Sequence, residues 1–278
     1  MEDAVILYRG MNRAALDAAY NNSAAVVDSP RRLADFDARS DHLRAARPRY
    51  LDLRYGEAER NRIDYFAARA GGPVLIFIHG GYWQMRRKET FSFLATGPLA
   101  HGINVALVGY TLAPEKRLTG IVAEVRAAVN WLASRVEHYG GDPARLYVSG
   151  WSAGGHLAAM CMGDRVVQGG LAVSGIFDLE PIRLCYLNEK LGLDEEEANR
   201  LSPLRHPPSR CGSLVVAYGD AELPELQRQS DTFAATWARA GLSVRSAPLA
   251  GHDHFSILEE LALPDGQLTT LVRELVGG

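Results

Sequence analysis

A serine at position 152 lies in a setting that is typical of an enzymatic nucleophile. Residues 150–154 read Gly-Trp-Ser-Ala-Gly, the G-x-S-x-G pattern, and they follow the stretch ARLYVS and lead into GGHLAAMCM. A strand, a sharp turn and a helix in this order present a reactive serine at the tip of the turn. Glycines relieve the crowding of such a turn, and the amides of the following helix favour developing negative charge. The pattern therefore predicts Ser152 as a nucleophile, with a plain glycine-rich turn as the alternative.

A second glycine-rich segment could stabilise the charge that such a nucleophile creates. Residues 79–83 read HGGYW, follow the apolar run VLIFI and precede Ser152 in the chain. Two adjacent glycines let the main chain approach a reacting carbonyl group. We expect the main-chain amides of Gly81, Tyr82 and Ala153 to form an oxyanion hole, in which one donor is commonly worth ~10²–10³ in rate. The alternative is a tight turn between a strand and a loop.

A serine hydroxyl needs a base, and the base needs a carboxylate to orient it. Two histidines lie close together after the last predicted strand, in the sequence GHDHF at 251–255. We favour His254 as the base because Phe255 and the apolar residues just after it can anchor the loop. His252 is the alternative. The other histidines are expected to have packing or loop-stabilising roles: His42, His79, His101, His138, His156 and His206.

The carboxylate is expected between the serine and the histidine in chain order. The segment GDAE at 219–222 follows the apolar run SLVVAY and contains two acidic residues. Glu222 is favoured because it has the usual spacing from the strand and because Pro224 supports a turn there. Asp220 is the alternative, since Asp also fills ordinary turn positions. Asp178, after the preceding strand, is a third candidate.

These residues need a framework that brings them together. Eight short apolar or β-branched segments are predicted strands, and several are continuously apolar, which suits central strands covered on both faces of a mostly parallel sheet. The predicted strands cover residues 50–55, 62–66, 74–79, 104–109, 145–149, 170–174, 213–218 and 243–248.

Segments with helical spacing alternate with these strands. Residues 119–139 carry apolar residues at helical spacing, and residues 225–240 follow Pro224 and end before Gly241. The last helical segments are predicted at 255–263 and 267–276. This alternation predicts an α/β fold with helices on both faces of an eight-stranded, mostly parallel sheet.

Two segments do not fit the alternation. Residues 1–49 are polar and helix-prone, and residues 178–212 form a long insertion between two strands. A structureless loop of that length is uncommon within a compact domain. We expect both segments to be helical and to cap the strand ends, or else to be surface extensions. The length of 278 residues suits a single domain, 1–278.

Composition narrows the class of protein. Thirty basic and 33 acidic residues give a net charge of −3 without a block of like charge, so neither nucleic acid nor a membrane surface is expected as a partner. Three cysteines are too few for a disulfide framework, and the sequence shows no signal peptide or membrane-spanning run, which favours the cytoplasm. No nucleotide, flavin or metal motif is present, so no cofactor is expected. An exposed edge strand within 50–66 leaves a homodimer open.

The combination of motifs resembles a known family. Residues 110–115, YTLAPE, are similar to a motif of the hormone-sensitive-lipase-like branch of the α/β-hydrolases. More narrowly, the chain resembles the arylformamidases, or kynurenine formamidases, of the serine-hydrolase type. The segments that carry this resemblance are HGGYW at 79–83, SAGGHLAA at 152–159, SGIFDLEPI at 174–182, LSPL at 201–204, residues 222–230 and DHF at 253–255.

The resemblance implies an α/β-hydrolase fold with a triad at Ser152, Glu222 and His254. One departure is that animal members carry Asp where Glu222 stands here. Another is that many bacterial formamidases belong to an unrelated metal-dependent family, whose His-rich motifs this sequence lacks. The implied activity is cleavage of an aryl formamide similar to N-formylkynurenine, or of a small ester, through an acyl-enzyme.

A formyl group is small, so we expect the wide side of the pocket to receive an aromatic leaving group. Tyr82, Trp83 and Trp151 are placed to line that side, although ordinary core packing would explain them equally well. Three other functions stay open: a general carboxylesterase of the same fold, a zinc hydrolase using His252, Asp253 and His254, and a non-catalytic binding protein with this fold.

Overall fold

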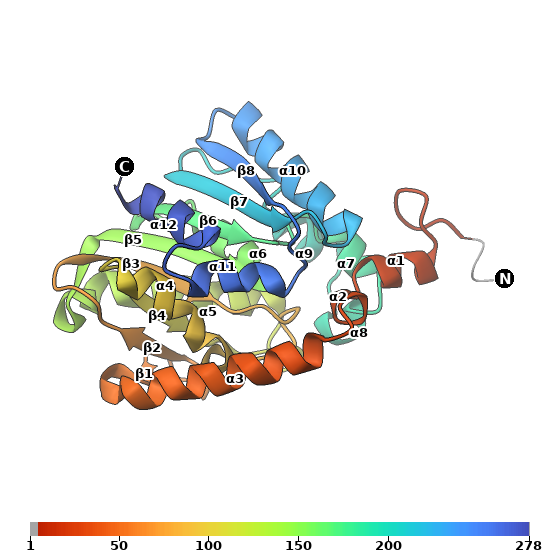
Figure 1. Cartoon of the computed structure of the whole chain (residues 1–278). Helices are drawn as coiled ribbons and strands as arrows, with labels where there is room; N and C mark the ends of the chain where they lie inside the picture. The colour runs from red at the N-terminus through yellow and green to blue at the C-terminus, as the bar shows by residue number, and fades with distance from the viewer. Residues whose placement is uncertain (1–4, 278) are drawn as a thin grey trace.

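The computed structural model describes residues 5–277 and is built around one eight-stranded sheet, in the strand order β1-β2-β4-β3-β5-β6-β7-β8 (Figure 1). Strands β4, β3 and β5 to β8 run parallel, whereas β2 pairs antiparallel with both β1 and β4. The mostly parallel sheet predicted from the apolar runs is therefore confirmed. The strands are β1 (Leu53–Arg54), β2 (Arg62–Phe66), β3 (Gly72–Ile78), β4 (Asn104–Val108), β5 (Gly141–Trp151), β6 (Val167–Val173), β7 (Ser213–Gly219) and β8 (Val244–Leu249).

Two hydrophobic cores cover the two faces of the sheet. Alternate residues of β3 enter them, with Ile76 and Ile78 in one core and Leu75 and Phe77 in the other. A parallel sheet buried on both faces requires such continuous apolar strands. The first core is closed by α5 (Leu118–Arg135), α6 (Ala153–Cys161) and α10 (Pro224–Arg239). The second is closed by α3 (Ser29–Ala46), η3 (Lys88–Ala95), α4 (Thr96–Ala100), α11 (Glu259–Ala262) and α12 (Gln267–Gly277).

Several elements differ from their predicted bounds. The first predicted strand, 50–55, is reduced to the two residues of β1, because a 3-10 turn at Pro48–Tyr50 precedes it and Asp52 has a φ of +56°. Residues 88–100, for which the sequence pattern predicts no element, form η3 and α4. The apolar run in this segment is short, and Gly97 and Pro98 follow it. The sequence therefore shows no clear helical periodicity there.

Within the described residues, each of the two segments outside the alternation contains three helices. The first contains α1 (Arg13–Ala19), α2 (Asn22–Ala25) and α3, and the second contains α7 (Glu180–Leu184), α8 (Asn188–Leu191) and α9 (Glu195–Arg200). Figure 1 shows α1, α2, α7 and α8 grouped beyond one end of the sheet, while α3 runs along its side. The Tyr8 hydroxyl donates a hydrogen bond of 2.9 Å to Asp178, which joins the two segments. A capping role for them remains a prediction.

A partly buried ion cluster joins η3 to the antiparallel edge of the sheet. The Lys88 ammonium donates to Asp52 and Glu89 at 2.6 Å and to Asp64 at 2.9 Å, and Arg44 of α3 pairs with Asp64. Burial alone would raise the pKa of Asp52 and Glu89, but the hydrogen bond and charge of Lys88 outweigh it, so both pKa values lie below their usual range. Lys88 is thus the cation of a three-carboxylate cluster.

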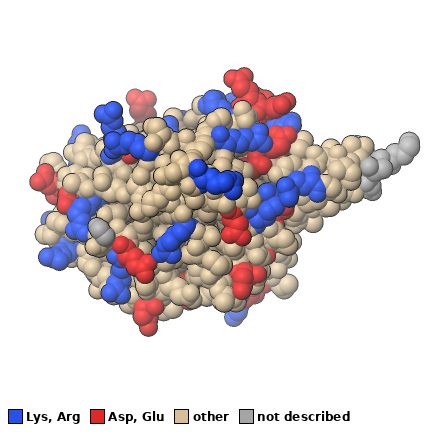
Figure 2. Space-filling view, turned by 90° about the horizontal axis from the view of Figure 1, so that it is seen from above, with Lys and Arg blue, Asp and Glu red and all other residues tan. Residues whose placement is uncertain are grey.

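Charges of both signs are interspersed on the molecular face seen in Figure 2, which shows no broad area of a single sign. Among residues 5–277, no helix combines the length and the apolar character needed to cross a membrane.

Candidate active site

Ser152 lies at a strained turn between a strand of the sheet and a helix. Strand β5 ends at Trp151 and α6 begins at Ala153, so Ser152 alone forms the turn, with φ 58° and ψ −120°. A positive φ is costly for a residue with a Cβ and persists only where the surroundings enforce it. The Ser152 amide donates to the Val173 carbonyl of β6 at 2.8 Å.

Both glycines of the G-x-S-x-G pattern are required because neither position has room for a side chain. A Cβ on Gly150 would lie 2.2 Å from the Gly154 carbonyl oxygen, and one on Gly154 would lie 2.0 Å from the Ile78 carbonyl oxygen. No side chain fits at these distances. The close packing of α6 against β3 therefore explains why both positions are glycine.

Glu222 and His254 form a direct, buried pair. His254 Nδ1 lies 2.7 Å from Glu222 Oε2, with 4% and 0% of the two side chains exposed. The other carboxylate oxygen, Oε1, accepts hydrogen bonds from Ser174 Oγ at 2.5 Å and from the Gly219 amide at 2.7 Å. A histidine held through Nδ1 by a carboxylate keeps Nε2 free to act as a base.

Trp151 joins this pair to the serine. Its indole Nε1 donates to the His254 carbonyl oxygen at 2.8 Å, and the two rings lie 4.8 Å apart. The histidine loop is thereby fixed to the residue that precedes Ser152. Within residues 5–277 the Ser152 hydroxyl forms no hydrogen bond with the imidazole. Such catalytic contacts are often long without substrate and tighten when it binds.

The alternative acids and base have other polar contacts. Asp220 is exposed and accepts from the Gly251 amide at 2.7 Å, the turn role considered for it. His252 Nε2 lies 3.5 Å from Glu260, and Asp178 accepts from Tyr8 and Arg205. The structure brings Glu222, and not Asp220 or Asp178, to His254.

The glycine-rich loop lies directly behind the nucleophile. A Cβ on Gly80 would be 2.6 Å from the Trp151 ring and 3.1 Å from Ser152 Cβ, and Gly81 has a φ of +109°. In the described part of the chain, the main-chain amides of Gly81, Tyr82 and Ala153 have no hydrogen-bond acceptor. Their role as an oxyanion hole stays a prediction, since their direction toward a substrate is not tested.

The three aromatic side chains expected at the substrate are buried in the core. Trp83 and Trp151 are 0% and 3% exposed, and the Tyr82 hydroxyl donates to the Tyr20 carbonyl and accepts from Asn22. Trp151 has a role that the sequence pattern did not indicate, because it holds the histidine loop. Contact of these rings with substrate remains a prediction.

Two buried histidines are structural. His79 donates from Nδ1 to the Gly80 carbonyl oxygen, 2.8 Å away, and its ring stacks on Tyr110. His156 Nε2 lies 2.8 Å from the Leu201 carbonyl, which joins α6 to the 178–212 insertion. Burial lowers the pKa of both rings to about 4, so both are neutral at physiological pH.

A cavity of about 420 Å³ adjoins the Glu222–His254 pair. One wall is the segment from Asn22 to Arg32, and the other comprises the acid and histidine loops. Asn22 is 2% exposed, and its Oδ1 has no hydrogen-bond partner among the described residues. The 178–212 insertion does not line this cavity.

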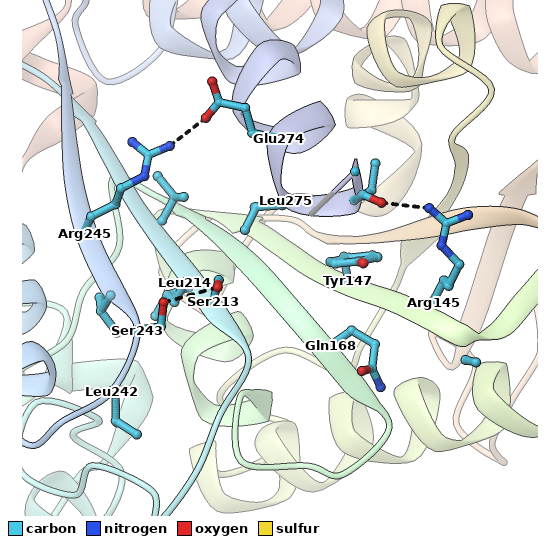
Figure 3. Close-up of a pocket in the computed structure, with 15 residues that line it drawn as sticks. Arg145, Tyr147, Gln168, Ser213, Leu214, Leu242, Ser243, Arg245, Glu274 and Leu275 are labelled. Carbon is cyan, nitrogen blue, oxygen red and sulfur yellow. Dashed lines mark hydrogen bonds and ion pairs between the residues drawn. The ribbon is translucent and has the colours of Figure 1, made fainter.

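A larger cavity of about 850 Å³ lies far from these residues (Figure 3). It is bordered by the first residues of β7 and β8 and by the end of α12, where Arg245 pairs with Glu274 at 2.8 Å. Because β5 to β8 are parallel, this cavity is at the edge of the sheet opposite Ser152. It is therefore not part of the candidate site.

The strand order, the turn at Ser152 and the acid–histidine pair define an α/β-hydrolase. Comparisons with solved structures agree. A Silicibacter sp. crystal structure described provisionally as a thioesterase superimposes with a TM-score of 0.84 at 28% identity, covering 95% of this chain and 99% of the other. A thermostable carboxylesterase from a metagenomic library has a TM-score of 0.67 at 21% identity over 77% of this chain and 84% of the other, which supports the fold alone.

Sequence relatives identify the family. The chain is 34% identical over 254 residues to kynurenine formamidase of Danio rerio, covering 86% of this chain and 85% of the relative. It is 37% identical over 246 residues to kynurenine formamidase of Salmo salar, covering 82% of each chain. A family model described as BD-FAE matches residues 65–169. The chain belongs to the kynurenine formamidase family and is a hydrolase of formamide or ester bonds.

Proposed function

We propose that this enzyme cleaves an aryl formamide of the N-formylkynurenine type through an acyl-enzyme on Ser152, with His254 as the base and Glu222 as the orienting acid. The observation that carries the proposal is the 2.7 Å hydrogen bond between Glu222 and His254, fixed beside Ser152 by the Trp151 indole. The similarity to two fish kynurenine formamidases supports the substrate class.

The reaction would proceed in two halves. His254 removes the proton of the Ser152 hydroxyl as its oxygen bonds to the formyl carbon, and the amides of Gly81, Tyr82 and Ala153 stabilise the oxyanion. The C–N bond then breaks, and the leaving amine takes the proton from His254. Water attacks the formyl ester by the same route, which releases formate and restores the serine.

The leaving group must lie next to His254, because His254 protonates it. The cavity of about 420 Å³ adjoins this ring and combines apolar residues such as Val26 and Leu223 with the charged residues Asp28, Arg32 and Asp253. An aromatic amine with a charged amino-acid tail suits such a lining. This supports the segment from Asn22 to Arg32 as part of a cap over the site.

The test of this function is a comparison of kcat/KM for N-formylkynurenine, formanilide and short p-nitrophenyl esters with the purified protein. We expect N-formylkynurenine to be the best substrate by at least about tenfold, which is ~1.4 kcal/mol of transition-state discrimination. A higher kcat/KM for the simple esters would overturn the formamide assignment.

A general carboxylesterase is the second candidate, because esters and formamides react through the same kind of tetrahedral intermediate. It is favoured by similarity to a probable isoprenylcysteine methylesterase of Arabidopsis thaliana, 26% identical over 72% of this chain and 49% of the relative. The same substrate panel separates the two functions.

The zinc alternative requires His252 and His254 to face one ion together. Their rings lie instead against different carboxylates, Glu260 and Glu222, which argues against it. A non-catalytic binding protein would have no need for the buried Glu222–His254 pair. A burst of product from an activated ester would exclude it.

We further propose that the enzyme works in the cytoplasm on a small molecule. The free thiols of Cys161, Cys185 and Cys211 support a reducing compartment. Locating a tagged copy in cell fractions tests this placement.

A further inference from the structure

The carboxylate of Glu222 has a third partner that the sequence motifs do not indicate. Ser174, the residue after β6, is fully buried, and its hydroxyl donates to Glu222 Oε1 at 2.5 Å. Together with the Gly219 amide, this hydroxyl occupies Oε1 and leaves Oε2 to His254. One carboxylate oxygen therefore anchors the Glu222 side chain, and the other binds the histidine.

The conformation of Ser174 is unusual for its position. Its φ is +51°, in the left-handed region that disfavours residues with a Cβ, and its amide donates to the Ala217 carbonyl of β7 at 2.7 Å. Glycine would remove this strain but would supply no hydroxyl. The strain is offset by the short hydrogen bond to a fully buried charged group, the strong kind of hydrogen bond.

Glu222 needs such an anchor more than an aspartate would. Glutamate has one more rotatable bond than aspartate, so its carboxylate can point in more directions. Ser174, just after β6, and Gly219, at the end of β7, both donate to Oε1. The plane of the carboxylate is thereby fixed, and Oε2 faces His254 Nδ1.

We propose that Ser174 is a positioning residue of the active site, whose hydroxyl keeps the Glu222 carboxylate aimed at His254. This rests on the proposed function, in which Glu222 is the triad acid. Ser174 touches neither substrate nor nucleophile and acts only through Glu222.

The experiment compares four variants: Ser174→Ala, Ser174→Gly, Ser149→Ala and Glu222→Gln. Ser149 is the matched control, because it is also fully buried in the sheet and its hydroxyl donates to the Leu171 carbonyl at 2.8 Å, not to the triad. The glycine variant separates the hydroxyl from the backbone strain, since glycine accepts a positive φ. Urea midpoints of all four variants establish that each is folded.

We expect Ser174→Ala and Ser174→Gly to lower kcat by about 10- to 100-fold, the worth of a hydrogen bond to a charged group, with KM within about twofold. The acidic limb of the kcat/KM profile should also differ from that of the wild type, because the hydroxyl that orients the carboxylate is gone. The other charged groups beside Glu222 and His254 are Asp28, Arg32 and Asp253, which these variants leave unchanged. Ser149→Ala should keep the wild-type kcat and profile.

A Ser174→Gly profile that superimposes on that of Ser149→Ala would overturn the inference and leave Ser174 a packing residue. If Glu222→Gln retains wild-type kcat, the proposed triad fails instead. The two failures are therefore distinguishable within one data set.

Discussion

At the scale of the residue, the candidate site depends on a buried carboxylate that accepts three hydrogen bonds. Glu222 accepts from Ser174, Gly219 and His254, and its side chain is inaccessible to solvent. A buried carboxylate is stable only when it is paired and hydrogen-bonded in this way. The hydrogen bond to Glu222 holds Nδ1 of His254, which leaves Nε2 for the role proposed for this ring.

Replacing Glu222 with glutamine should keep the shape of the site but favour the wrong histidine tautomer. We expect Glu222→Gln to lower kcat by ~10³–10⁴, as in other triads whose acid becomes an amide. Asp220→Asn is the control, and its kcat should stay within about threefold of the wild-type value. Among the described residues, the Asp220 side chain accepts a hydrogen bond from the Gly251 amide and does not contact His254. Steady-state kinetics on the best formamide measures both, and comparable losses in the two variants would contradict the assignment of the acid.

At the scale of the element, the strands and helices that carry the motifs could be predicted from the sequence. The continuously apolar runs became central strands, and the G-x-S-x-G and HGG segments became the turns after β5 and β3. Ser174 could not be singled out, because one serine after a strand carries no periodic signal. Ser174 contacts Glu222 because β6 and β7 are neighbours in the sheet. The spacing of residues along the chain does not show which strands are neighbours.

Other elements escaped prediction for similar reasons. Lys88 begins η3, and its ion cluster is assembled with Asp52 and Asp64, which lie far from it in the chain. The aromatic residues Trp83 and Trp151 carry the same hydrophobic signal whether they face substrate or core. The cavity beside His254 arises from the packing of α2 and α3 against the acid loop, a tertiary contact.

The Lys88 cluster yields a prediction at this scale. Lys88→Met should lower the free energy of unfolding by ~3–5 kcal/mol, because Asp52, Asp64 and Glu89 lose their shared buried cation. Lys190→Met, at an exposed position on α8, should change it by no more than ~0.5 kcal/mol. Urea unfolding measures both variants, and equal midpoints would show that the cluster contributes little to stability.

At the scale of the whole molecule, the sheet separates two cores, and its two ends differ. The carboxyl ends of the parallel strands carry Ser152 and the acid and histidine loops, where α/β folds place their ligands. The amino ends border the polar cavity of Figure 3. Two buried histidines besides His254 lie in this framework: His79 follows β3 and His156 lies in α6.

These two histidines make global stability depend on pH. Burial lowers the pKa of each ring from 6.5 to about 4, so below pH 6.5 the unfolded chain binds protons that the folded chain does not. The free energy of unfolding should therefore fall by about 2 kcal/mol per ring between pH 7.5 and 5.

Urea unfolding of His156→Gln at both pH values tests this dependence. The glutamine amide can donate to the Leu201 carbonyl in place of the ring, so the variant should fold. Between pH 7.5 and 5, its free energy of unfolding should fall by about 2 kcal/mol less than that of the wild type. His138→Gln, at an exposed position, should follow wild type. An unchanged pH dependence in His156→Gln would show that burial does not keep this ring neutral.

The most direct test of the whole account is covalent labelling of the nucleophile by an organophosphate, read by mass spectrometry of the intact protein and its peptides. The account predicts a single adduct on Ser152, formed rapidly in wild type, slowly in Glu222→Gln and not at all in Ser152→Ala. An adduct on another residue, or one that persists in Ser152→Ala, would contradict it.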